Sequence, residues 1–508
     1  MELITHALGA LSPLNLALAL LGVTAGIVIG ALPGLSATMA VAVLVPVTFG
    51  MAPESALIML GAIYTGAIYG GSYSAILVNT PGTPSAIATT FDGYPMAQRG
   101  DGDLAVTLST IASVVGGLVG VLALLLLAPL LAQVALSFGP VEYFWLAIFG
   151  LTLISALSED STLKGFMGAG LGLLLSTVGV AVIGGDIRYT YGMPVLLGGI
   201  ETVSALIGLY CIPVLIDLVA TPAAHLKVDD ASRGVRFREG LGEAIRGKWN
   251  LLRSATIGTG VAILPGAGGS IASLVSYSEA RRVARDPGSF GKGNPQGVLA
   301  TESANNATVG GGFIPTLVLG IPGTPPDAVI LGALLVQGFR TGPELFTTNA
   351  GITYTFVAGL FLATCLLLPL GLLIGRYAFK SIIAIPKALL VPTIAFMTVI
   401  GTYAIRNSAS DVMIMLCLGV VGWVLNRYGF RPSPIVLGLI LGPIAEQGFV
   451  QGFLMGRASG SVVGTFFGGP ISLIIIALSL LSVFYPLVKA RRVAKRQGNN
   501  SLNEEVSS

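Results

Sequence analysis

Long apolar stretches, interrupted by small residues and short polar clusters, run through the whole chain. Residues 119–131 and 471–483 contain no charged side chain. Stretches of about 20 mostly apolar residues recur, which is the length that a helix needs to cross a bilayer. The pattern predicts an all-α polytopic membrane protein with roughly 10–14 membrane segments.

Two of the apolar stretches are interrupted by the same tetrapeptide. Pro-Gly-Thr-Pro occupies residues 81–84 and again 322–325, and a Gly-Gly pair precedes each copy at the same distance, at 70–71 and 311–312. Proline ends a helix and frees backbone groups that lipid cannot satisfy, so each break needs partners nearby. Matched breaks in the two halves of a hydrophobic chain indicate a transport site.

The breaks belong to a longer internal repeat. At an offset of 241 residues, eight identities fall between residues 64 and 104, and Asp103 aligns with Glu344. A Leu-Pro-Gly triplet at 32–34 recurs at 264–266, an offset of 232. We therefore expect two repeats, each with broken helices or re-entrant hairpins. The expected organisation is a first membrane repeat at 1–220, a cytoplasmic linker at 221–254, a second membrane repeat at 255–488 and a cytoplasmic tail at 489–508.

Basic residues orient the chain. They gather in five polar segments that the positive-inside rule places in the cytoplasm, namely 227–253, 281–292, 376–387, 427–431 and 489–496. The repeat counterpart of 281–292 is 48–55, which has no basic residue and is expected outside. Threading the crossings from a cytoplasmic Arg99 puts its counterpart Arg340 on the outer side. The two repeats are therefore predicted to be inverted.

Composition narrows the function classes. Of the 508 residues, 54% are hydrophobic and 10% are charged, and the mean hydropathy is +0.86, whereas a soluble domain has about 25% charged residues. The net charge of +3 gives no signal for nucleic acid. The three cysteines lie in apolar segments, and the two histidines belong to no metal or catalytic constellation. No nucleotide-binding motif and no nucleophile–base pair is found, which disfavours an ATP-driven pump and an enzyme.

The first break carries candidate groups for binding an anion. Thr83 suits a helix N-cap and Pro84 the first turn. A helix starting there is expected to point free amides and its positive dipole end into the protein, where a carboxylate binds. The candidate substrate-binding residues of this break are Asn79, Thr80, Gly82, Thr83 and Ser85.

The second break follows a polar helix face. Its candidate substrate-binding residues are Ser303, Asn305, Asn306, Gly323 and Thr324. Polar groups in a glycine-rich membrane segment are costly unless they are used. Either break alone is better explained by a tight kink capped by Asn and Thr, but the shared register of two copies favours a site.

A coupling cation has its own candidate ligands. They are the Leu-Pro-Gly turns, through Leu32, Gly34, Leu264 and Gly266, and the Glu302 carboxylate, because unwound backbone carbonyls suit Na⁺. The other acidic residues near the spans, Asp92, Glu201, Asp217 and Asp327, are read as ion ligands or as interfacial charges. Since no Lys or Arg falls inside a clear span, an anionic substrate needs helix ends, amides, hydroxyls and a co-bound Na⁺ or H⁺. No organic cofactor is expected, and a resident metal ion is left open.

Six motifs carry a resemblance to a known family. They are Gly30-Ala-Leu-Pro-Gly34, Tyr69-Gly-Gly-Ser72, Asn79-Thr-Pro-Gly-Thr-Pro84, Asp92-Gly-Tyr-Pro-Met-Ala97, Leu264-Pro-Gly266 and Gly320-Ile-Pro-Gly-Thr-Pro325. Over essentially its whole length, the chain resembles the large permease subunit of the bacterial tripartite tricarboxylate transporters. The resemblance implies a small membrane subunit, a periplasmic solute-binding protein that delivers an organic acid, and uptake driven by a cation gradient.

The expected function is secondary active, cation-coupled uptake of a tri- or dicarboxylate such as citrate by a multi-pass protein of the bacterial inner membrane. A stand-alone carboxylate carrier without a binding protein is the alternative. An intramembrane enzyme is disfavoured because it lacks a nucleophile–base pair or a metal set. Recognition by helix ends suits citrate, smaller dicarboxylates and aromatic carboxylates alike, so the sequence leaves the substrate open.

Overall fold

The chain folds into helices that are interrupted at the predicted breaks. The computed structural model describes residues 8–156, 161–220, 234–377 and 379–484. The tail predicted at 489–508 and residues 221–233 of the predicted linker lie outside the described residues. The chain divides into two compact units, residues 1–136 with 200–427 (unit 1) and residues 137–199 with 428–508 (unit 2). The predicted division into repeats at residue 220 is a different property of the chain and stays a prediction.

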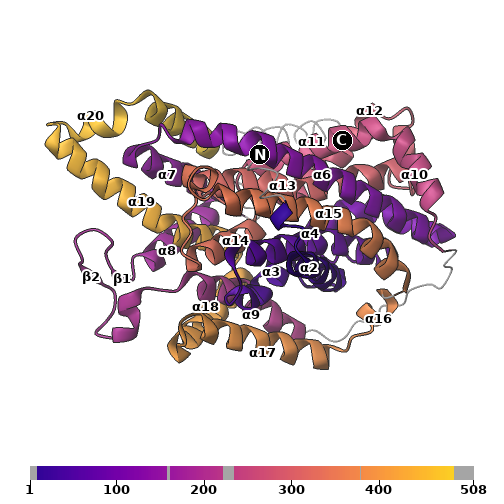
Figure 1. Cartoon of the computed structure of the whole chain (residues 1–508), viewed down its shortest axis with the longest axis horizontal. Coiled ribbons are helices and arrows are strands. Elements are labelled where there is room, and N and C mark those ends of the chain that lie inside the picture. Colours follow the sequence, from indigo (N-terminus) through magenta and orange to yellow (C-terminus); the bar gives the residue numbers. More distant parts are fainter. Residues whose placement is uncertain (1–7, 157–160, 221–233, 378, 485–508) are drawn as a thin grey trace, which may run out of the picture. The chain divides into compact units, whose positions relative to one another are not determined.

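Unit 1 contains both breaks (Figure 1). Its α-helices are α2 (Pro13–Ala31), α3 (Ala37–Leu44), α4 (Pro53–Val78), α5 (Thr90–Met96), α6 (Gly102–Ala135), α9 (Thr202–Ala220), α10 (Phe237–Arg246), α11 (Lys248–Ile263), α12 (Gly268–Val283), α13 (Pro295–Leu319), α14 (Pro325–Val336), α15 (Ala350–Tyr377), α16 (Phe379–Ile383), α17 (Lys387–Arg406) and α18 (Ala409–Arg427). Shorter helical segments are η1 (Val45–Thr48), η2 (Pro84–Thr89), η3 (Ala97–Asp101), η5 (Pro287–Ser289) and η6 (Pro343–Phe346). Most of the described part of the predicted linker is thus helical, in α10 and the start of α11.

Unit 2 is a smaller helical unit with a short hairpin. It consists of α7 (Pro140–Ala156), α8 (Thr162–Ser176), the antiparallel strands β1 (Gly179–Val180) and β2 (Ile187–Arg188), η4 (Pro194–Gly198), α19 (Pro432–Ala458), α20 (Val462–Phe467) and an apolar helix at Pro470–Phe484. Small residues let α8 and α19 pack closely, since a Cβ on Gly172 would lie 2.0 Å from the Ile435 carbonyl oxygen. Arg188 pairs with Glu446 at 2.8 Å, which ties the hairpin to α19.

The all-α polytopic fold is confirmed. Eight helices in the described residues are long and apolar enough to cross a membrane, and five shorter helices are also apolar. The helix α13 is not among them, because its sequence is too polar, although it has 25 residues. Every residue from Gly297 to Val318 is nevertheless buried, and so is every residue of α4 from Ser55 to Ile76. Both helices are therefore enclosed by protein, where polar side chains can find partners.

The direction of α6 relative to α13 follows from close glycine contacts. A Cβ on Gly116 of α6 would lie 2.0 Å from the Ser303 carbonyl oxygen of α13. One turn further along both helices, a Cβ on Gly120 would lie 2.5 Å from the Ala307 carbonyl oxygen. Because residue numbers rise together, α6 and α13 run parallel.

The helix α4 runs the other way. Leu77 at its end lies beside Gly102 at the start of α6, whereas the Tyr69 hydroxyl, two turns earlier, is 2.6 Å from the Thr110 hydroxyl. The helices α4 and α13, which correspond at an offset of 241 residues, therefore point in opposite directions. This antiparallel pair is the predicted inversion of the two repeats.

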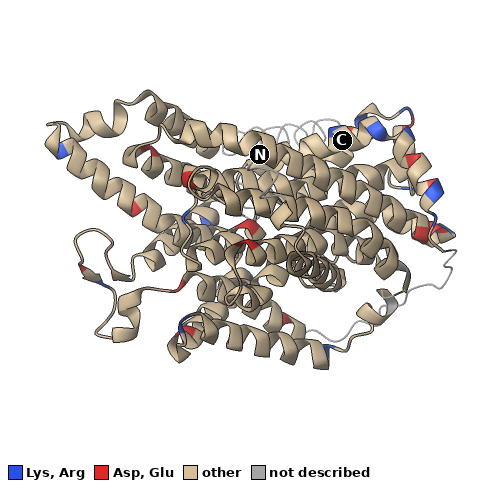
Figure 2. Cartoon of the chain, viewed as in Figure 1, with Lys and Arg blue, Asp and Glu red and all other residues tan. Residues whose placement is uncertain are grey.

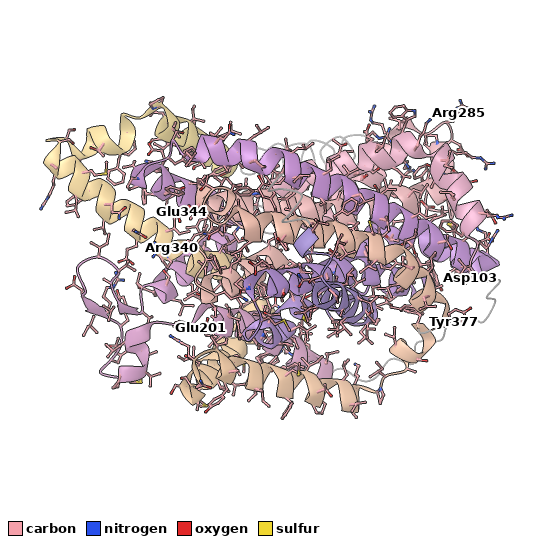
Figure 3. The ribbon with its side chains drawn as sticks, viewed as in Figure 1. Asp103, Glu201, Arg285, Arg340, Glu344 and Tyr377 are labelled. Carbon is pink, nitrogen blue, oxygen red and sulfur yellow. The ribbon has the colours of Figure 1, made fainter. Side chains whose placement is uncertain are left out.

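Charged residues mark the two ends of unit 1. Basic residues gather around α10 and α12 at one end (Figure 2). Figure 3 shows Asp103 and Arg285 at this end and Arg340 and Glu344 towards the other. Arg99 donates to the Gly293 carbonyl at 2.6 Å, which places it beside the basic loop after α12. These positions agree with the predicted opposite sides of the repeat counterparts.

Candidate functional site

The helices α4 and α13 end at matched left-handed residues. Asn79 follows α4 with φ 54° and ψ 26°, and Gly320 follows α13 with φ 70° and ψ 18°. The chain turns sharply there, and a proline comes two residues later in both repeats, so neither helix continues. Both Pro-Gly-Thr-Pro breaks therefore begin with the same left-handed backbone turn.

The helix that precedes each Leu-Pro-Gly turn reaches the break of its own repeat. A Cβ on Gly82 would lie 2.1 Å from the Gly30 carbonyl oxygen at the end of α2. A Cβ on Gly323 would lie 2.5 Å from the Ala262 carbonyl oxygen at the end of α11. The Gly266 N–H also donates to the Gly323 carbonyl at 2.9 Å. Only glycine fits at these two positions, because backbone meets backbone there.

Each break also contacts the long helix of the opposite repeat. The Tyr64 hydroxyl of α4 and the Thr324 hydroxyl of the second break are hydrogen bonded at 2.8 Å. Asn305 of α13, the repeat counterpart of Tyr64, lies near Ser85 of the first break, since both border Gly269. A Cβ on that glycine would be 2.7 Å from Asn305 Oδ1 and 2.8 Å from Ser85 Cβ. The breaks are therefore connected through α4 and α13 inside unit 1.

The second break contains its own carboxylate. Asp327 Oδ2 accepts the Thr324 backbone N–H at 2.8 Å and the Thr324 hydroxyl at 2.6 Å, which forms a capping box at the start of α14. Asp327 packs against Gly312, where a Cβ would be 2.2 Å from Oδ2. The helix cap thus satisfies Oδ2, whereas Oδ1 is buried without a hydrogen bond.

The first break has the same backbone without a carboxylate. Thr83 has φ −118° and ψ 149°, near the −136° and 163° of Thr324, but Ala86 stands where the second repeat has Asp327. The Thr83 hydroxyl is 3.1 Å from Ser85 Oγ. Among the described residues, the Thr83 backbone N–H has no hydrogen-bond partner. This break therefore has the donors that hold a carboxylate in the second repeat and lacks the internal carboxylate.

The helix start predicted at the first break is present. The 3₁₀ segment η2 begins after Thr83 and passes without interruption into α5, whereas its counterpart α14 is α-helical over 12 residues. The first break therefore offers an anion the free amides at the start of this helical run, together with local hydroxyls.

A group of buried polar side chains surrounds Glu302 on α13. The Thr89 hydroxyl donates to Glu302 Oε1, and the Ser113 hydroxyl donates to Oε2 at 3.3 Å. Asn306 Nδ2 donates to Ser113 Oγ at 2.7 Å. Asn305 lies beside the carboxyl group. Glu302 and both asparagines are 0% exposed.

Some side-chain polar atoms of the two asparagines have no hydrogen-bond partner within the protein. Both side-chain polar atoms of Asn305 and Oδ1 of Asn306 are buried without a hydrogen bond. An unsatisfied buried group costs about 1–3 kcal/mol, so such atoms are rare unless they serve a purpose. Their concentration beside one carboxylate is what a binding site for a polar ligand requires.

Glu302 differs from the other buried charges. Within the described residues, every buried charged side chain is acidic, namely Asp92, Glu201, Glu302, Asp327 and Asp411. Asp92 and Glu201 accept backbone N–H groups, Asp327 caps α14, and Asp411 pairs with Arg406 at 2.8 Å. Glu302 alone is held only by neutral side chains.

The remaining predicted residues have local roles. Ser303 Oγ donates to the Leu251 carbonyl at 2.9 Å, and Thr80 Oγ1 to the Val78 carbonyl at 3.3 Å. Asn79 is exposed and ends α4. Leu32 and Leu264 both end their helices with φ −83°, and the turn glycines Gly34 and Gly266 have φ 93° and 83°. The structure thus brings Thr83, Ser85, Glu302, Asn305 and Asn306 into one region.

Sequence reasoning missed two members of the region, Thr89 and Ser113, and the Tyr64 contact to the second break. All three are single hydroxyls in apolar helices or at their ends, and such residues often bond to their own helix. No pattern distinguishes them before the fold is known. In the part of the chain that the structure describes, no three His, Cys, Asp or Glu side chains cluster, and the side chains that contact Glu302 are neutral hydroxyls and amides.

Comparisons with known proteins place these features in a family. Residues 16–437 match the Tripartite tricarboxylate transporter TctA family. An Agrobacterium vitis protein, described as an uncharacterized 52.8 kDa protein in the TAR-I ttuC' 3' region, is 36% identical over 497 residues, which cover 95% of both chains. A second protein of that organism, described as an uncharacterized protein in the TAR-II ttuC' 3' region, is 35% identical over 241 residues, which cover 47% of this chain and 98% of that protein. No solved structure matches the chain.

Proposed function

The chain belongs to the tripartite tricarboxylate transporter TctA family, and from that premise we propose that it carries an organic acid into the bacterial cell by secondary active transport. The substrate is a tri- or dicarboxylate such as citrate. A member of a transporter family moves its substrate unchanged, so no catalytic residue is assigned. The protein is multi-pass, and the inner membrane is the compartment proposed for it.

The first break is the proposed site for a substrate carboxylate. The observation that carries this assignment is the difference between the repeats. In the second repeat the Asp327 carboxylate accepts hydrogen bonds from the amide and hydroxyl of Thr324. In the first repeat Ala86 has no carboxylate, so the amide and hydroxyl of Thr83 can donate to a ligand. A carboxylate hydrogen bonded by an amide and a hydroxyl gains charge-assisted bonds without a basic residue.

The charge of the region supports the proposed cation coupling. Among the described residues no buried side chain is basic. A polycarboxylate entering this interior loses its hydration, which costs several kcal/mol per charge without compensation. A co-transported Na⁺ or H⁺ supplies the positive charge and, by moving down its gradient, the driving force.

The proposed partners are a periplasmic solute-binding protein, which delivers the acid, and a small membrane subunit. The tripartite family supports them. A stand-alone carboxylate carrier is the second candidate, and the two differ in one measurable respect. The tripartite system transports only when the binding protein is added on the outer side, whereas a stand-alone carrier transports without it.

Reconstitution tests this proposal. Proteoliposomes containing the chain and the small subunit, supplied with binding protein and labelled citrate, should accumulate the label when a Na⁺ or proton gradient is imposed. Ionophores that collapse both gradients should abolish accumulation, and ATP should not replace the gradients. Accumulation that survives the ionophores would contradict coupled transport. A substrate panel of smaller dicarboxylates and aromatic carboxylates, run under the same gradient, identifies the acid.

A further inference from the structure

We propose that Glu302, Asn305 and Asn306, together with the hydroxyls of Thr89 and Ser113, form a binding site for Na⁺ as the coupling ion. The inference rests on the proposed cation-coupled uptake and names its ion and its ligands. The five side chains come from α13, η2 and α6 and lie inside unit 1.

The ligand set suits a hard monovalent cation. It offers one carboxylate and several neutral oxygens from amides and hydroxyls, and hard cations prefer oxygen ligands. Asn305 and Asn306 are three and four residues after Glu302, so all three lie on one face of α13. A single negative charge balanced by one Na⁺ leaves the buried site neutral.

The unpartnered amide oxygens favour Na⁺ over a proton. A proton on Glu302 would neutralise the carboxylate and add a single O–H donor. Oδ1 of Asn305 and Oδ1 of Asn306 both lack a hydrogen bond, so at least one of them would stay unsatisfied. A sodium ion beside the carboxylate attracts all of these oxygens at once. The excess of acceptor atoms is thus explained by a metal cation and not by protonation.

The position of the site explains how ion and substrate are coupled. Thr89 and Ser113 belong to the first repeat and Glu302 to the second, so the ion joins the two repeats. Asn305 also borders Gly269 opposite Ser85 of the first break. A cation at Glu302 and a carboxylate at the first break therefore attract each other in a low-dielectric interior, where each bound alone is unfavourable.

Asp327 is the matched control. It is buried to the same extent as Glu302, at 0% exposure, and lies in the same unit. Its carboxylate already accepts two hydrogen bonds from Thr324. Asp327→Asn keeps an acceptor oxygen for Thr324 and should not affect ion binding at Glu302.

The test is the thermal unfolding of the purified full chain in detergent, with NaCl replaced by KCl or N-methylglucamine chloride at constant ionic strength. Sodium should raise the Tm of the wild type, because a ligand that binds the folded state stabilises it. Glu302→Gln should lose the Na⁺-dependent rise, and Asp327→Asn should retain it. Asn305→Leu removes two unpartnered atoms, so it should fold at least as well while losing at least about tenfold in apparent Na⁺ affinity.

The outcomes separate this inference from the proposed function. A wild type with equal Tm in the three salts, or a Glu302→Gln variant with an unchanged Na⁺ response, overturns the sodium site. If such a protein still accumulates citrate on a proton gradient, coupled uptake stands and only the ion site is wrong. If Glu302→Gln does not fold, the Asn305→Leu variant decides: an unaltered Na⁺ response in that variant also overturns the site.

Discussion

Asn79 and Gly320, 241 residues apart, take the same left-handed conformation at the ends of α4 and α13. A left-handed residue with a Cβ costs about 1–2 kcal/mol, and Asn is one of the few residues that tolerate it. The conserved feature between the repeats is therefore the backbone turn, which two different residues provide.

This turn gives the first prediction. Asn79→Gly should fold like the wild type and keep uptake within a few fold, because the second repeat uses glycine there. Asn79→Val should lower the stability by about 1–3 kcal/mol, since a β-branched residue resists φ near 54°. Thermal unfolding of both variants checks this. If Asn79→Gly folds normally but does not transport, the side chain itself contacts the substrate.

Close approach at Gly82 gives the second prediction. A Cβ there would lie 2.1 Å from the Gly30 carbonyl oxygen, so Gly82→Ala must push apart α2 and the break and should destabilise the chain by about 1–3 kcal/mol. Gly260→Ala is the control, because a Cβ at this exposed residue of α11 meets nothing within 4 Å. It should be neutral or stabilising. Equal loss of folded protein in both variants would contradict the steric argument.

The inverted repeats give the third prediction. Arg285 and Glu344 are exposed and lie at opposite ends of unit 1. Single cysteines at these positions, in a chain whose three cysteines are replaced by alanine, should be labelled from opposite sides of the membrane. We expect Arg285→Cys to react from the cytoplasm and Glu344→Cys from outside. Labelling of both from one side contradicts the inverted arrangement.

Asp92, the first residue of the Asp92–Ala97 motif, connects the two repeats. Its Oδ1 accepts the backbone N–H groups of Gly291, Gly293 and Asn294 at 2.9, 2.8 and 2.7 Å, and its Oδ2 accepts the Tyr277 hydroxyl at 2.9 Å. One carboxylate of the first repeat thus holds the loop that precedes α13 in the second.

The fourth prediction concerns this loop. Asp92→Ala should leave three backbone donors without their acceptor and loosen residues 291–294, so that their amide hydrogen exchange accelerates at least about tenfold. Exchange in the middle of α13 should change little. A variant that protects these amides as well as the wild type does would show that the loop is held by other contacts.

The sequence predicted the features that depend on backbone geometry. Proline and glycine at matched offsets revealed the two breaks and the inverted repeat, because few other residues adopt these conformations or allow such close approach. The polar face of α13 was visible as well, since Glu302, Asn305 and Asn306 interrupt an apolar pattern.

Interactions between distant segments were not predictable. Thr89 and Ser113 are ordinary hydroxyl residues in the sequence, and only the packing of η2 and α6 around α13 brings them to Glu302. The cap formed by Asp327 was missed because the residue was read as a possible ion ligand or an interfacial charge. The helix start at Thr83 and Pro84 was predictable from these residue types, but the 3₁₀ form of its first six residues was not.

The last prediction tests the substrate site through the difference between the repeats. Ala86 occupies the position of Asp327, whose carboxylate accepts the amide and hydroxyl of Thr324. Ala86→Asp should place a carboxylate on the same groups of Thr83 and mimic a bound substrate.

The Ala86→Asp variant should therefore fold, which a wild-type elution profile and a cooperative thermal transition would show. Its citrate uptake should fall by about 10- to 150-fold. This range corresponds to the 1.5–3 kcal/mol of a hydrogen bond to a charged group. Ala86→Asn has nearly the same size without the charge, so it separates steric blockage from occupation by an anion. We expect Ala86→Asn to retain more uptake than Ala86→Asp, because an amide competes less well than a carboxylate for the donors of Thr83. Normal transport by a folded Ala86→Asp variant would place the substrate carboxylate away from the first break.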